Sequence, residues 1–473
     1  MITASAFAGQ HYAVYGLARS GVATVEALLA SGAKVTAWDA NEEARSSLRA
    51  ELVGRGTSEA GGGVETANTS HPSTIESPSD GSPPHASHGE ELTIANLDTA
   101  DLTQFDSLVV TPGLPLNRHP IAQRARDAGV EIIGDIELFA RARPELPPHK
   151  VVGITGTNGK STTTALVHHI LKTGGLPSAM GGNIGLPILA QDPLPEAGVY
   201  VLELSSYQID LTQSLDCDVA VLLNITPDHL DRYESFEAYA ESKVRLFEMQ
   251  YGAGRDAIGV IDDALVAHIF DPDLDLLPGN RESRTRISAK IDPQEQSSWP
   301  ALQGPHNAQN VAAARIVAFD LGIHRDVVEQ ALRTYPGLPH RMERIREKDG
   351  VTFVNDSKAT NPTATAPALA AFEKIRWICG GQAKTDNLDE CAPHFGHVRK
   401  AYTIGEASEL FARLLSPHVD VAECETLERA VGKAAAEAEA GDTVLLSPAC
   451  ASFDQFRDFE DRGERFRELV GAL

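Results

Sequence analysis

Residues 151–163 read VVGITGTNGKSTT, and this stretch decides the fold. Its first four residues form a continuous run without a polar side chain, as in strands that are buried on both faces of a parallel sheet. Gly156 and Gly159 then form a turn in which no Cβ blocks the backbone, and a helix is expected to begin near Lys160. A strand, a glycine turn and a helix in this order predict an α/β domain.

The same turn predicts a phosphate site. Its backbone N–H groups converge on an anion, and the helix N-terminus adds about half a positive charge. Lys160 can neutralise the outer phosphates, and the Ser161 hydroxyl can bind Mg²⁺. Ile154 replaces the first glycine of the general P-loop motif. The alternative is a glycine turn with an exposed lysine and no ligand, but it does not account for the closely spaced Gly, Thr, Asn, Lys and Ser residues of TGTNGKST as well as a phosphate site does. We predict an ATP site formed by Gly156, Thr157, Asn158, Gly159, Lys160, Ser161, Thr162 and Thr163.

Length and charge exclude several classes of protein. The chain has 473 residues, 42% of them hydrophobic and 23% charged, which suits about three globular domains. Lysine and arginine number 41 against 66 aspartate and glutamate, so the net charge is −25. A chain this acidic repels nucleic acid, so we exclude a nucleic-acid function.

Cysteine spacing and hydropathy indicate the compartment. The five cysteines contain no C-x-x-C pair, and neither a signal peptide nor a long apolar span is found. We expect a cytoplasmic protein without membrane insertion.

Two proline-rich stretches divide the chain, at 143–148 (RPELPP) and at 336–339 (PGLP). Strand and helix patterns alternate throughout. The predicted fold is therefore α/β with three domains: a Rossmann-like domain over 1–148, a central P-loop ATPase-type domain with a parallel sheet over 149–336, and a Rossmann-like domain over 337–473.

The segment 57–90 differs from the rest in composition. It is rich in Gly, Ser, Thr, Pro and His and contains no Lys or Arg. Such a segment cannot bury enough apolar area to offset its ordering entropy, so we predict a disordered insertion. Its three histidines, His71, His85 and His88, are a weak case for a metal site.

The N-terminus begins like a nucleotide-binding βαβ unit. His11–Tyr15 predicts a strand, Gly16 and Gly21 flank the turn, and Asp39 closes a second strand. Ala18 replaces the second glycine of the G-x-G-x-x-G pattern, so this signal for a dinucleotide is weak. A nicotinamide oxidoreductase would also leave the ATP loop unexplained.

Charged residues interrupt or follow two further strands. Tyr200–Leu204 is apolar except for Glu203, and a carboxylate in a buried strand needs a partner or a metal unless it lies at an exposed strand end. NITPDHLDRY at 224–233 follows the next apolar strand, which puts His229 where α/β sheets bind ligands. Lys243 lies in a predicted helix, where its local pattern indicates a solvated lysine.

Taken together, these motifs resemble the Mur ligases of peptidoglycan synthesis, a family that extends to folylpolyglutamate synthases. Besides the glycine loop, the resemblance is carried by GNIG at 182–185, LELSSYQ at 202–208, NITPDHLDRY at 224–233 and HNAQN at 306–310. It covers nearly the whole chain apart from the insertion. NDSKATN at 355–361 and LSPACASFDQF at 446–456 resemble the members that add D-glutamate, and the D-N-P-R segment of the diaminopimelate- or lysine-adding members is absent.

The resemblance implies that D-glutamate is joined to UDP-N-acetylmuramoyl-L-alanine through an acyl phosphate, with ATP and two Mg²⁺ ions. It implies Lys160, His229 and Lys243 as catalytic residues, and a metal site of Ser161, Glu203, His229 and Lys243, with Lys243 carrying a carbamate. Further nucleotide contacts would come from Asn307, Asn310, Arg341 and Asp356. Substrate contacts would come from Asn183, Lys358, Thr360, Lys384, Ser452 and Phe459. We expect a monomer.

Two alternatives stay open. One is another ATP-dependent amide ligase, which adds a different amino acid or extends folate. The other is a nucleotide sensor without ligase activity, which would hydrolyse ATP slowly whatever amino acid is offered. Glu203, His229 and Lys243 together argue against the sensor, because a sensor needs no second metal site.

Overall fold

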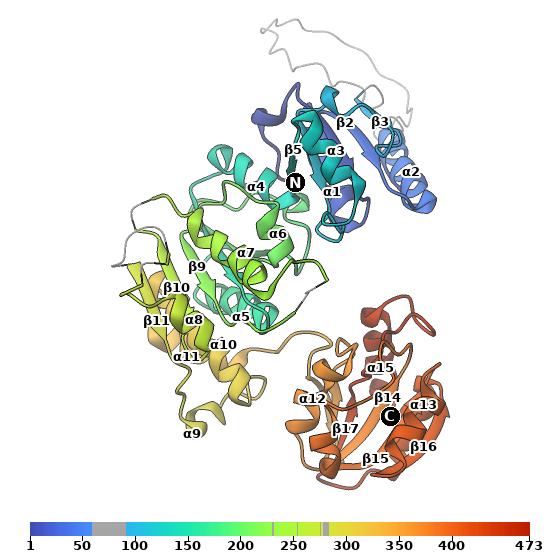
Figure 1. The fold of residues 1–473 in the computed structure, drawn as a ribbon. Coiled ribbons are helices and arrows are strands. Elements are labelled where there is room, and N and C mark those ends of the chain that lie inside the picture. Colours follow the sequence, from blue (N-terminus) through green and yellow to red (C-terminus); the bar gives the residue numbers. More distant parts are fainter. Residues whose placement is uncertain (59–90, 229–230, 253, 275, 278–282) are drawn as a thin grey trace, which may run out of the picture. The chain divides into compact units, whose positions relative to one another are not determined.

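The computed structural model describes residues 1–58, 91–228, 231–252, 254–274, 276–277 and 283–473. The chain divides into two compact units, Met1–Lys160 with Gly175–Ile287 and Ser161–Gly174 with Ser288–Leu473. The described residues form three sheets (Figure 1). The domain boundaries at residues 148 and 336 stay predictions. The described helices include none with the length and apolarity to cross a membrane.

The first sheet is parallel and has the order β3-β2-β1-β4-β5. Its strands are β1 (His11–Tyr15), β2 (Lys34–Trp38), β3 (Leu92–Ile94), β4 (Ser107–Val110) and β5 (Glu131–Ile133). Successive residues of β1 pack into different cores, Tyr12 and Val14 into one, Ala13 and Tyr15 into the other. The covering helices are α1 (Arg19–Ala30), α3 (Pro120–Ala128) and α4 (Asp135–Ala142). The strand order reverses between β1 and β4, where such sheets bind ligands.

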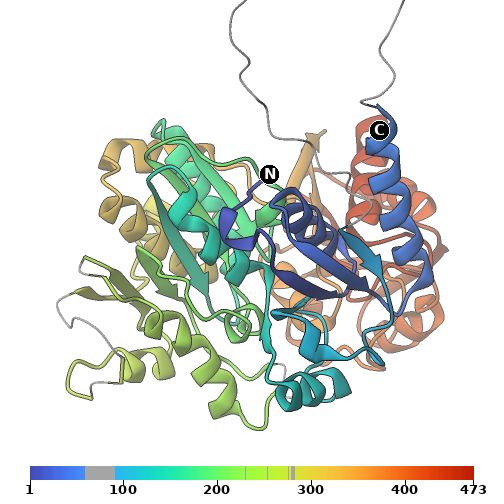
Figure 2. The same cartoon turned by 90° about the horizontal axis from the view of Figure 1, so that it is seen from above.

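Helix α2 (Glu42–Ser58) is the long blue helix of Figure 2. Thr57 and Ser58 are its last two residues, so the prediction that the disordered insertion begins at residue 57 is wrong for these two positions. A helix that is already formed can extend through poor helix formers, because each further residue adds a hydrogen bond without a new nucleation cost. The rest of the predicted insertion, 59–90, lies outside the described residues, with its three histidines.

The second sheet, also parallel, has the order β11-β10-β9-β6-β8-β7. Its strands are β6 (His149–Thr155), β7 (Ser178–Gly182), β8 (Gly198–Glu203), β9 (Val219–Leu222), β10 (Asp256–Val260) and β11 (Arg284–Ile287). The helices that follow are α5 (Lys160–Thr173), α6 (Ser206–Asp210), α7 (Phe236–Glu248) and α8 (Ala264–Ile269). The order reverses at β6, so the glycine loop between β6 and α5 occupies the ligand-binding position of the sheet. Three more helices precede the last sheet, α9 (Pro293–Gln296), α10 (Pro305–Asp320) and α11 (Arg325–Thr334).

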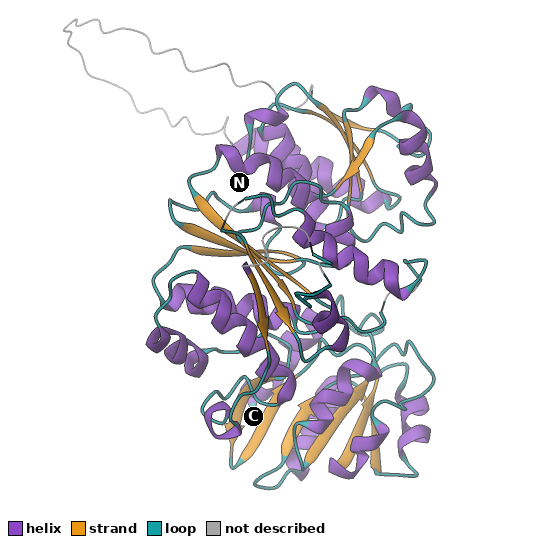
Figure 3. Ribbon diagram, turned by 60° about the vertical axis from the view of Figure 1, so that its left-hand side comes forward, coloured by secondary structure: helices purple, strands orange, loops and turns teal. Residues whose placement is uncertain are grey.

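The third sheet is mixed, in the order β12-β13-β17-β14-β15-β16. Its strands are β12 (Glu343–Lys348), β13 (Val351–Asn355), β14 (Ile375–Gly380), β15 (Val398–Ile404), β16 (Asp420–Glu425) and β17 (Thr443–Leu446). Five of them are parallel, and β12 is antiparallel to β13. Helices cover both faces (Figure 3), namely α12 (Pro362–Ala370), α13 (Ser408–Leu415), α14 (Leu427–Glu437) and α15 (Phe459–Ala472).

The antiparallel strand is an addition to the Rossmann-like arrangement predicted for this part of the chain. Asp349 and Gly350 connect β12 to β13, with φ of 52° and 76°. Positive φ at both positions is typical of the tight turn that joins two strands of a hairpin. The turn therefore directs the polar strand β12 back along β13 at the edge of the sheet.

Candidate functional site

In the loop between β6 and α5, backbone carbonyl groups bind the side chain of Lys160. Lys160 Nζ donates to the carbonyl oxygens of Gly156 at 2.9 Å and Thr157 at 2.8 Å. Gly156 and Gly159 have φ of 150° and 85°, values that favour glycine. The predicted strand, glycine turn and helix are confirmed, and α5 begins at Lys160.

The segment after β9 holds this loop in place. The Asn224 side chain accepts a hydrogen bond from Asn158 N at 2.8 Å and donates to Asn158 O at 3.1 Å. Its carbonyl oxygen accepts from Thr157 N at 2.9 Å. Asn224 belongs to the NITPDHLDRY motif, but the sequence predicted no role for it. Its place after a buried strand, at the start of that motif, was the signal that could have identified it.

Lys243 is buried, with 1% of its surface exposed, whereas its local sequence pattern indicates a solvated lysine. That expectation is wrong. Its Nζ donates to Gly156 O at 3.1 Å and lies 4.4 Å from the ring centre of Tyr239. Burial, and then the nearby charge of Lys160, lower the pKa of Lys243 to about 7. A large fraction of this side chain is therefore an uncharged amine at neutral pH.

Glu203 ends β8 and is only 2% exposed, so it is not a solvated strand-end residue. Asn183 donates to it twice, from Nδ2 to Oε1 at 3.1 Å and from its backbone N to the carbonyl oxygen at 2.9 Å. Oε2 is buried and has no hydrogen-bond partner among the described residues. A buried carboxylate oxygen without a partner is costly unless it binds a cation, so this residue fits a Mg²⁺ ligand.

The other predicted metal ligands are of different kinds. Ser161 is 6% exposed and supplies a hydroxyl oxygen at the second position of α5. His229 lies outside the described residues. Among those described, no group of three His, Cys, Asp or Glu side chains could hold a metal ion. A metal at Glu203 would therefore need other oxygen donors, such as a hydroxyl or the phosphates of a nucleotide.

In the second unit, two of the predicted nucleotide residues contact the helix that follows the glycine loop. Thr163 Oγ1 donates to Asn310 Oδ1 at 3.2 Å, and Asn310 Nδ2 donates to Asn307 Oδ1 at 3.1 Å. Arg341 Nη2 donates to Ser161 Oγ at 3.2 Å. These five predicted residues thus form two hydrogen-bonded groups, one at Ser161 and one at Thr163 of α5.

The C-terminal loops of three adjacent strands, β13, β17 and β14, carry the predicted amino-acid residues. Lys384 Nζ donates to Thr360 Oγ1 at 3.5 Å, and Lys358 Nζ lies 5.0 Å from the ring centre of Phe459. Ser452 is 2% exposed and follows β17. The sheet therefore brings lysines, hydroxyls and an aromatic ring to one edge, as a dicarboxylate with an apolar stem requires.

Asp356, just after β13, is buried. It accepts hydrogen bonds from Ser447 Oγ at 2.7 Å and from Met342 N at 3.1 Å. Burial raises the pKa of Asp356 to about 7, although both hydrogen bonds and the charge of Arg341 act in the opposite direction.

Arg462 of α15 connects the loop after β13 to the loop after β17. The sequence did not predict this role. Arg462 is 1% exposed and donates to the carbonyl oxygens of Ser357 at 2.9 Å and Cys450 at 3.1 Å. Its segment, EDRGERFRE, has the pattern of a charged surface helix, so no local signal identified it.

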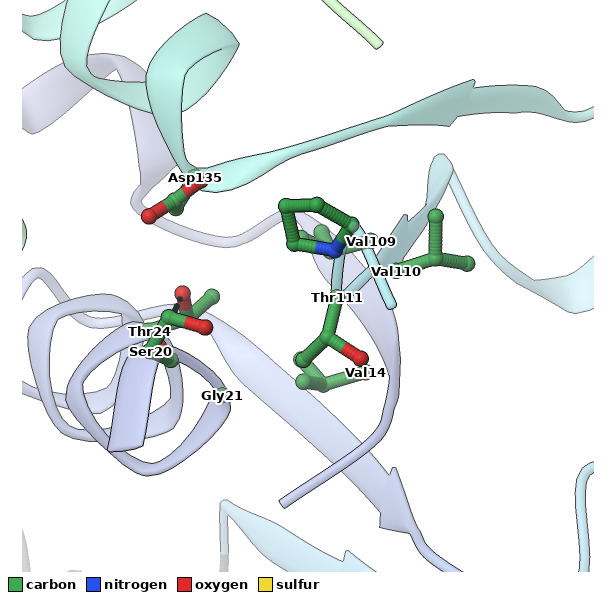
Figure 4. Close-up of a pocket in the computed structure, with 9 residues that line it drawn as sticks. Val14, Ser20, Gly21, Thr24, Val109, Val110, Thr111 and Asp135 are labelled. Carbon is green, nitrogen blue, oxygen red and sulfur yellow. Dashed lines mark hydrogen bonds between the residues drawn. The ribbon is translucent and has the colours of Figure 1, made fainter. Parts of the chain in front are cut away.

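The first sheet has a pocket at its switch point (Figure 4). Ser20, Gly21 and Thr24 of α1 face Thr111 after β4, and Asp135 at the start of α4 lies beside them. Both oxygens of Asp39 are occupied, because they accept from Leu17 N at 2.7 Å and Asn41 N at 2.8 Å. The carboxylate that a dehydrogenase would turn toward a ribose is thus used to hold the glycine turn, which disfavours the oxidoreductase alternative.

Comparison with known proteins identifies the family. Residues 154–273 match the Mur ligase middle domain, and residues 340–450 match the Mur ligase glutamate ligase domain. The UDP-N-acetylmuramoylalanine–D-glutamate ligase of Novosphingobium aromaticivorans is 54% identical over 473 residues, which cover 100% of this chain and 97% of that protein. The chain belongs to the Mur ligase family. The ligase of the same name from Sphingopyxis alaskensis is also 54% identical, with all of both chains covered.

Solved structures share the fold of this Mur ligase. The UDP-N-acetylmuramate–alanine ligase of Thermotoga maritima superposes with a TM-score of 0.55 at 16% identity, covering 98% of this chain and 99% of that one. The MurF ligase of Thermotoga maritima, solved with ADP, gives 0.52 at 18% identity over 78% of this chain and 90% of that one. The predicted family and the α/β architecture are confirmed.

Proposed function

We propose that the chain is an ATP-dependent ligase that joins D-glutamate to UDP-N-acetylmuramoyl-L-alanine in the synthesis of peptidoglycan precursors. The observation that carries the proposal is the arrangement after β6 and β8. Two lysines there share the Gly156 carbonyl, and the neighbouring strand ends in a buried carboxylate with an unpartnered oxygen. The cation at Lys160 and a metal ligand at Glu203 together suit a reaction in which two anions must meet. Full-length identity to proteins named D-glutamate ligases supports the choice of amino acid.

The chemistry explains why ATP is needed. A free carboxylate is a poor electrophile, because oxide is a poor leaving group. In the proposed reaction, an oxygen of the alanine carboxylate attacks the γ-phosphorus of ATP, and the bond to ADP breaks. The amine of D-glutamate then attacks the acyl carbon of the acyl phosphate and loses a proton. The amide forms as inorganic phosphate leaves.

In this proposal Lys160 neutralises the phosphates in the glycine loop, whose N–H groups and helix N-terminus also bind them. Ser161, Glu203, His229 and a carbamate on Lys243 would hold Mg²⁺, which supplies charge neutralisation between carboxylate and triphosphate when bound. The uncharged amine that burial creates at Lys243 is the form that reacts with CO₂, which supports the carbamate.

The remaining roles concern recognition. We assign Asn183 to the muramoyl acceptor, and Asn307, Asn310, Arg341 and Asp356 to the nucleotide. The D-glutamate carboxylates would bind Lys358, Lys384, Thr360 and Ser452, with Phe459 against the stem. The N-terminal pocket would take part of the uridine nucleotide. We further propose that the enzyme is a cytoplasmic monomer, and its five buried free cysteines suit a reducing compartment.

Phosphate release with each substrate omitted in turn tests the proposal. We expect release only when ATP, Mg²⁺, the muramoyl acceptor and D-glutamate are all present, and the Lys160→Ala variant to be inactive. Replacing D-glutamate with L-glutamate or diaminopimelate distinguishes ligases for other amino acids. Hydrolysis of ATP that is indifferent to the amino acid would contradict the proposal and favour a sensor.

A further inference from the structure

Arg232 connects two loops of the first unit. Its guanidinium donates to the carbonyl oxygens of three consecutive residues, Leu114 at 2.8 Å, Gly113 at 3.3 Å and Pro112 at 3.4 Å. Hydrogen bonds also run in the opposite direction. Asn117 Nδ2 and Arg118 Nη2 donate to the carbonyl oxygen of Asp231, at 3.0 and 2.6 Å. The segment 231–232 and the loop after β4 therefore each donate hydrogen bonds to the other.

The loop that Arg232 binds is one wall of the N-terminal pocket. Thr111 and Pro112 line that pocket, and Thr111 lies opposite Ser20 and Gly21 (Figure 4). Leu114 N donates to Thr111 O at 3.0 Å, which closes the turn within the loop. Because Arg232 fixes the carbonyl groups of this turn, it also fixes the pocket wall.

Arg232 is also connected to Lys243, which binds the glycine loop, by a series of contacts between aromatic rings. Its guanidinium carbon lies 4.2 Å from the ring centre of Tyr207, and Tyr207 stacks on Tyr233 with 6.1 Å between ring centres and an interplanar angle of 18°. Tyr233 lies 5.4 Å from Tyr239, whose ring carries Lys243 Nζ at 4.4 Å. Stacked rings and cation–π contacts of this kind are directional and resist sliding.

We propose that Arg232 is a positioning residue for the reaction, which couples the pocket of the first sheet to Lys243 through Tyr207, Tyr233 and Tyr239. The inference rests on the proposed function, in which the pocket receives the uridine nucleotide and Lys243 serves the phosphoryl transfer. Arginine suits the position because a planar guanidinium can donate to several carbonyl groups while one face stacks on a ring. A lysine ammonium is a point charge and cannot do both.

The experiment compares Arg232→Lys with wild type and with a matched control, Arg126→Lys. Arg126 is exposed on α3 and donates to Gln123 Oε1 on the same helix. The KM of each of the three substrates and kcat are measured by phosphate release. The affinity for uridine 5′-diphosphate is measured by calorimetry without ATP, and thermal unfolding is followed for each variant.

We expect Arg232→Lys to raise the KM of the muramoyl acceptor and the Kd of uridine diphosphate at least about tenfold and to lower kcat by a similar factor. The KM values of ATP and D-glutamate should change less than about twofold, and Arg126→Lys should match wild type. Wild-type constants in Arg232→Lys would overturn the inference. So would a proportional rise in all three KM values together with a lower unfolding temperature, because that pattern marks a purely structural role.

Tyr207 provides a second test that does not depend on the arginine variant folding. Tyr207→Phe keeps the ring, whereas Tyr207→Leu removes it, so kcat of Tyr207→Leu should be about tenfold below that of Tyr207→Phe. Equal kcat values in these two variants would contradict coupling through the rings. If wild-type enzyme released no phosphate at all, the proposed function would fail, but the uridine diphosphate affinities would still test the effect of Arg232 on the pocket.

Discussion

The Nζ atoms of Lys160 and Lys243 donate to one acceptor, the carbonyl oxygen of Gly156, at 2.9 and 3.1 Å. Two cations at one oxygen repel each other, and Lys243 is the more buried of the two. Burial and this repulsion together bring the pKa of Lys243 to about 7. The pair therefore combines a lysine suited to phosphate binding with a reactive amine.

The first prediction concerns the reaction of Lys243 with CO₂. Only the neutral amine attacks CO₂, and the products are a carbamate anion and a proton. Because the amine loses its charge as the pH rises through about 7, carbamate should increase from pH 6 to pH 8 at constant CO₂ pressure. Carbon NMR with ¹³CO₂ measures the carbamate signal. A signal that persists in Lys243→Met, or that does not change with pH in wild type, would contradict the assignment.

The second prediction concerns Glu203. In Glu203→Gln the hydrogen bond from Asn183 can persist, but the anionic ligand is lost, so we expect the ligase rate to fall at least about 100-fold, or about 2.7 kcal/mol. The unfolding temperature should change by less than about 3 °C. Steady-state rates over a Mg²⁺ titration and calorimetric melting measure the two effects.

Glu137 supplies the matched control, because it is also buried but fully hydrogen-bonded. Its carboxylate accepts from Gln213 N at 2.7 Å, Ser214 N at 2.9 Å and Arg141 Nε at 2.9 Å. Glu137→Gln should therefore lose about 1–3 kcal/mol of stability and keep its dependence on Mg²⁺. If both variants lost stability and neither lost rate, Glu203 would be a structural residue.

Elements with strong local signals could be predicted from the sequence. β1 has the predicted bounds, because a short apolar run that ends at a glycine turn leaves few alternatives. β12 could not be found in this way. Its sequence ERIREK is that of a surface segment, and it becomes a strand only because β13 offers an unpaired edge.

The residues of the candidate site likewise differ in how far their local sequence reveals them. Glu203 is recognisable because it interrupts an apolar strand. Lys243 is not, because its hydrogen-bond acceptor, the Gly156 carbonyl oxygen, is 87 residues away in the chain. Asn224, Arg232 and Arg462 also act through partners distant in sequence. Only the packing of the strands and loops brings those partners together, so no local pattern contains this information.

The third prediction concerns D-glutamate binding. The ring of Phe459 lies under the Lys358 ammonium at 5.0 Å, and a cation–π contact of this kind contributes about 0.5–1 kcal/mol at a partly exposed site. Phe459→Leu should raise the KM of D-glutamate about threefold to tenfold, through this contact and the lost wall of the site, without changing the KM of ATP. Phe459→Tyr keeps the ring and should stay within about twofold of wild type. Equal KM values for the two variants would show that the ring does not position the lysine.

The last prediction uses the buried carboxyl group of Asp356. Its pKa is about 7 in the folded protein and 3.8 without the fold. Between these values the folded state binds more protons than the unfolded state, so this group makes the protein less stable as the pH rises from 4 to 7. In Asp356→Asn this side chain is uncharged at every pH. The free energy of unfolding of the variant minus that of wild type should therefore increase by about 2–4 kcal/mol from pH 5 to pH 8. Its ligase activity should fall.

Urea unfolding at pH 5, 6, 7 and 8 measures this difference, and Asp442→Asn is the control. Asp442 is also buried, but its carboxylate is paired with Arg376 Nε at 2.9 Å, so its loss should destabilise the protein at pH 8. The two buried aspartates thus predict opposite signs at the same pH. If the difference between Asp356→Asn and wild type stayed constant from pH 5 to pH 8, Asp356 would be ionised throughout, and its hydrogen bonds from Ser447 and Met342 would outweigh the effect of burial.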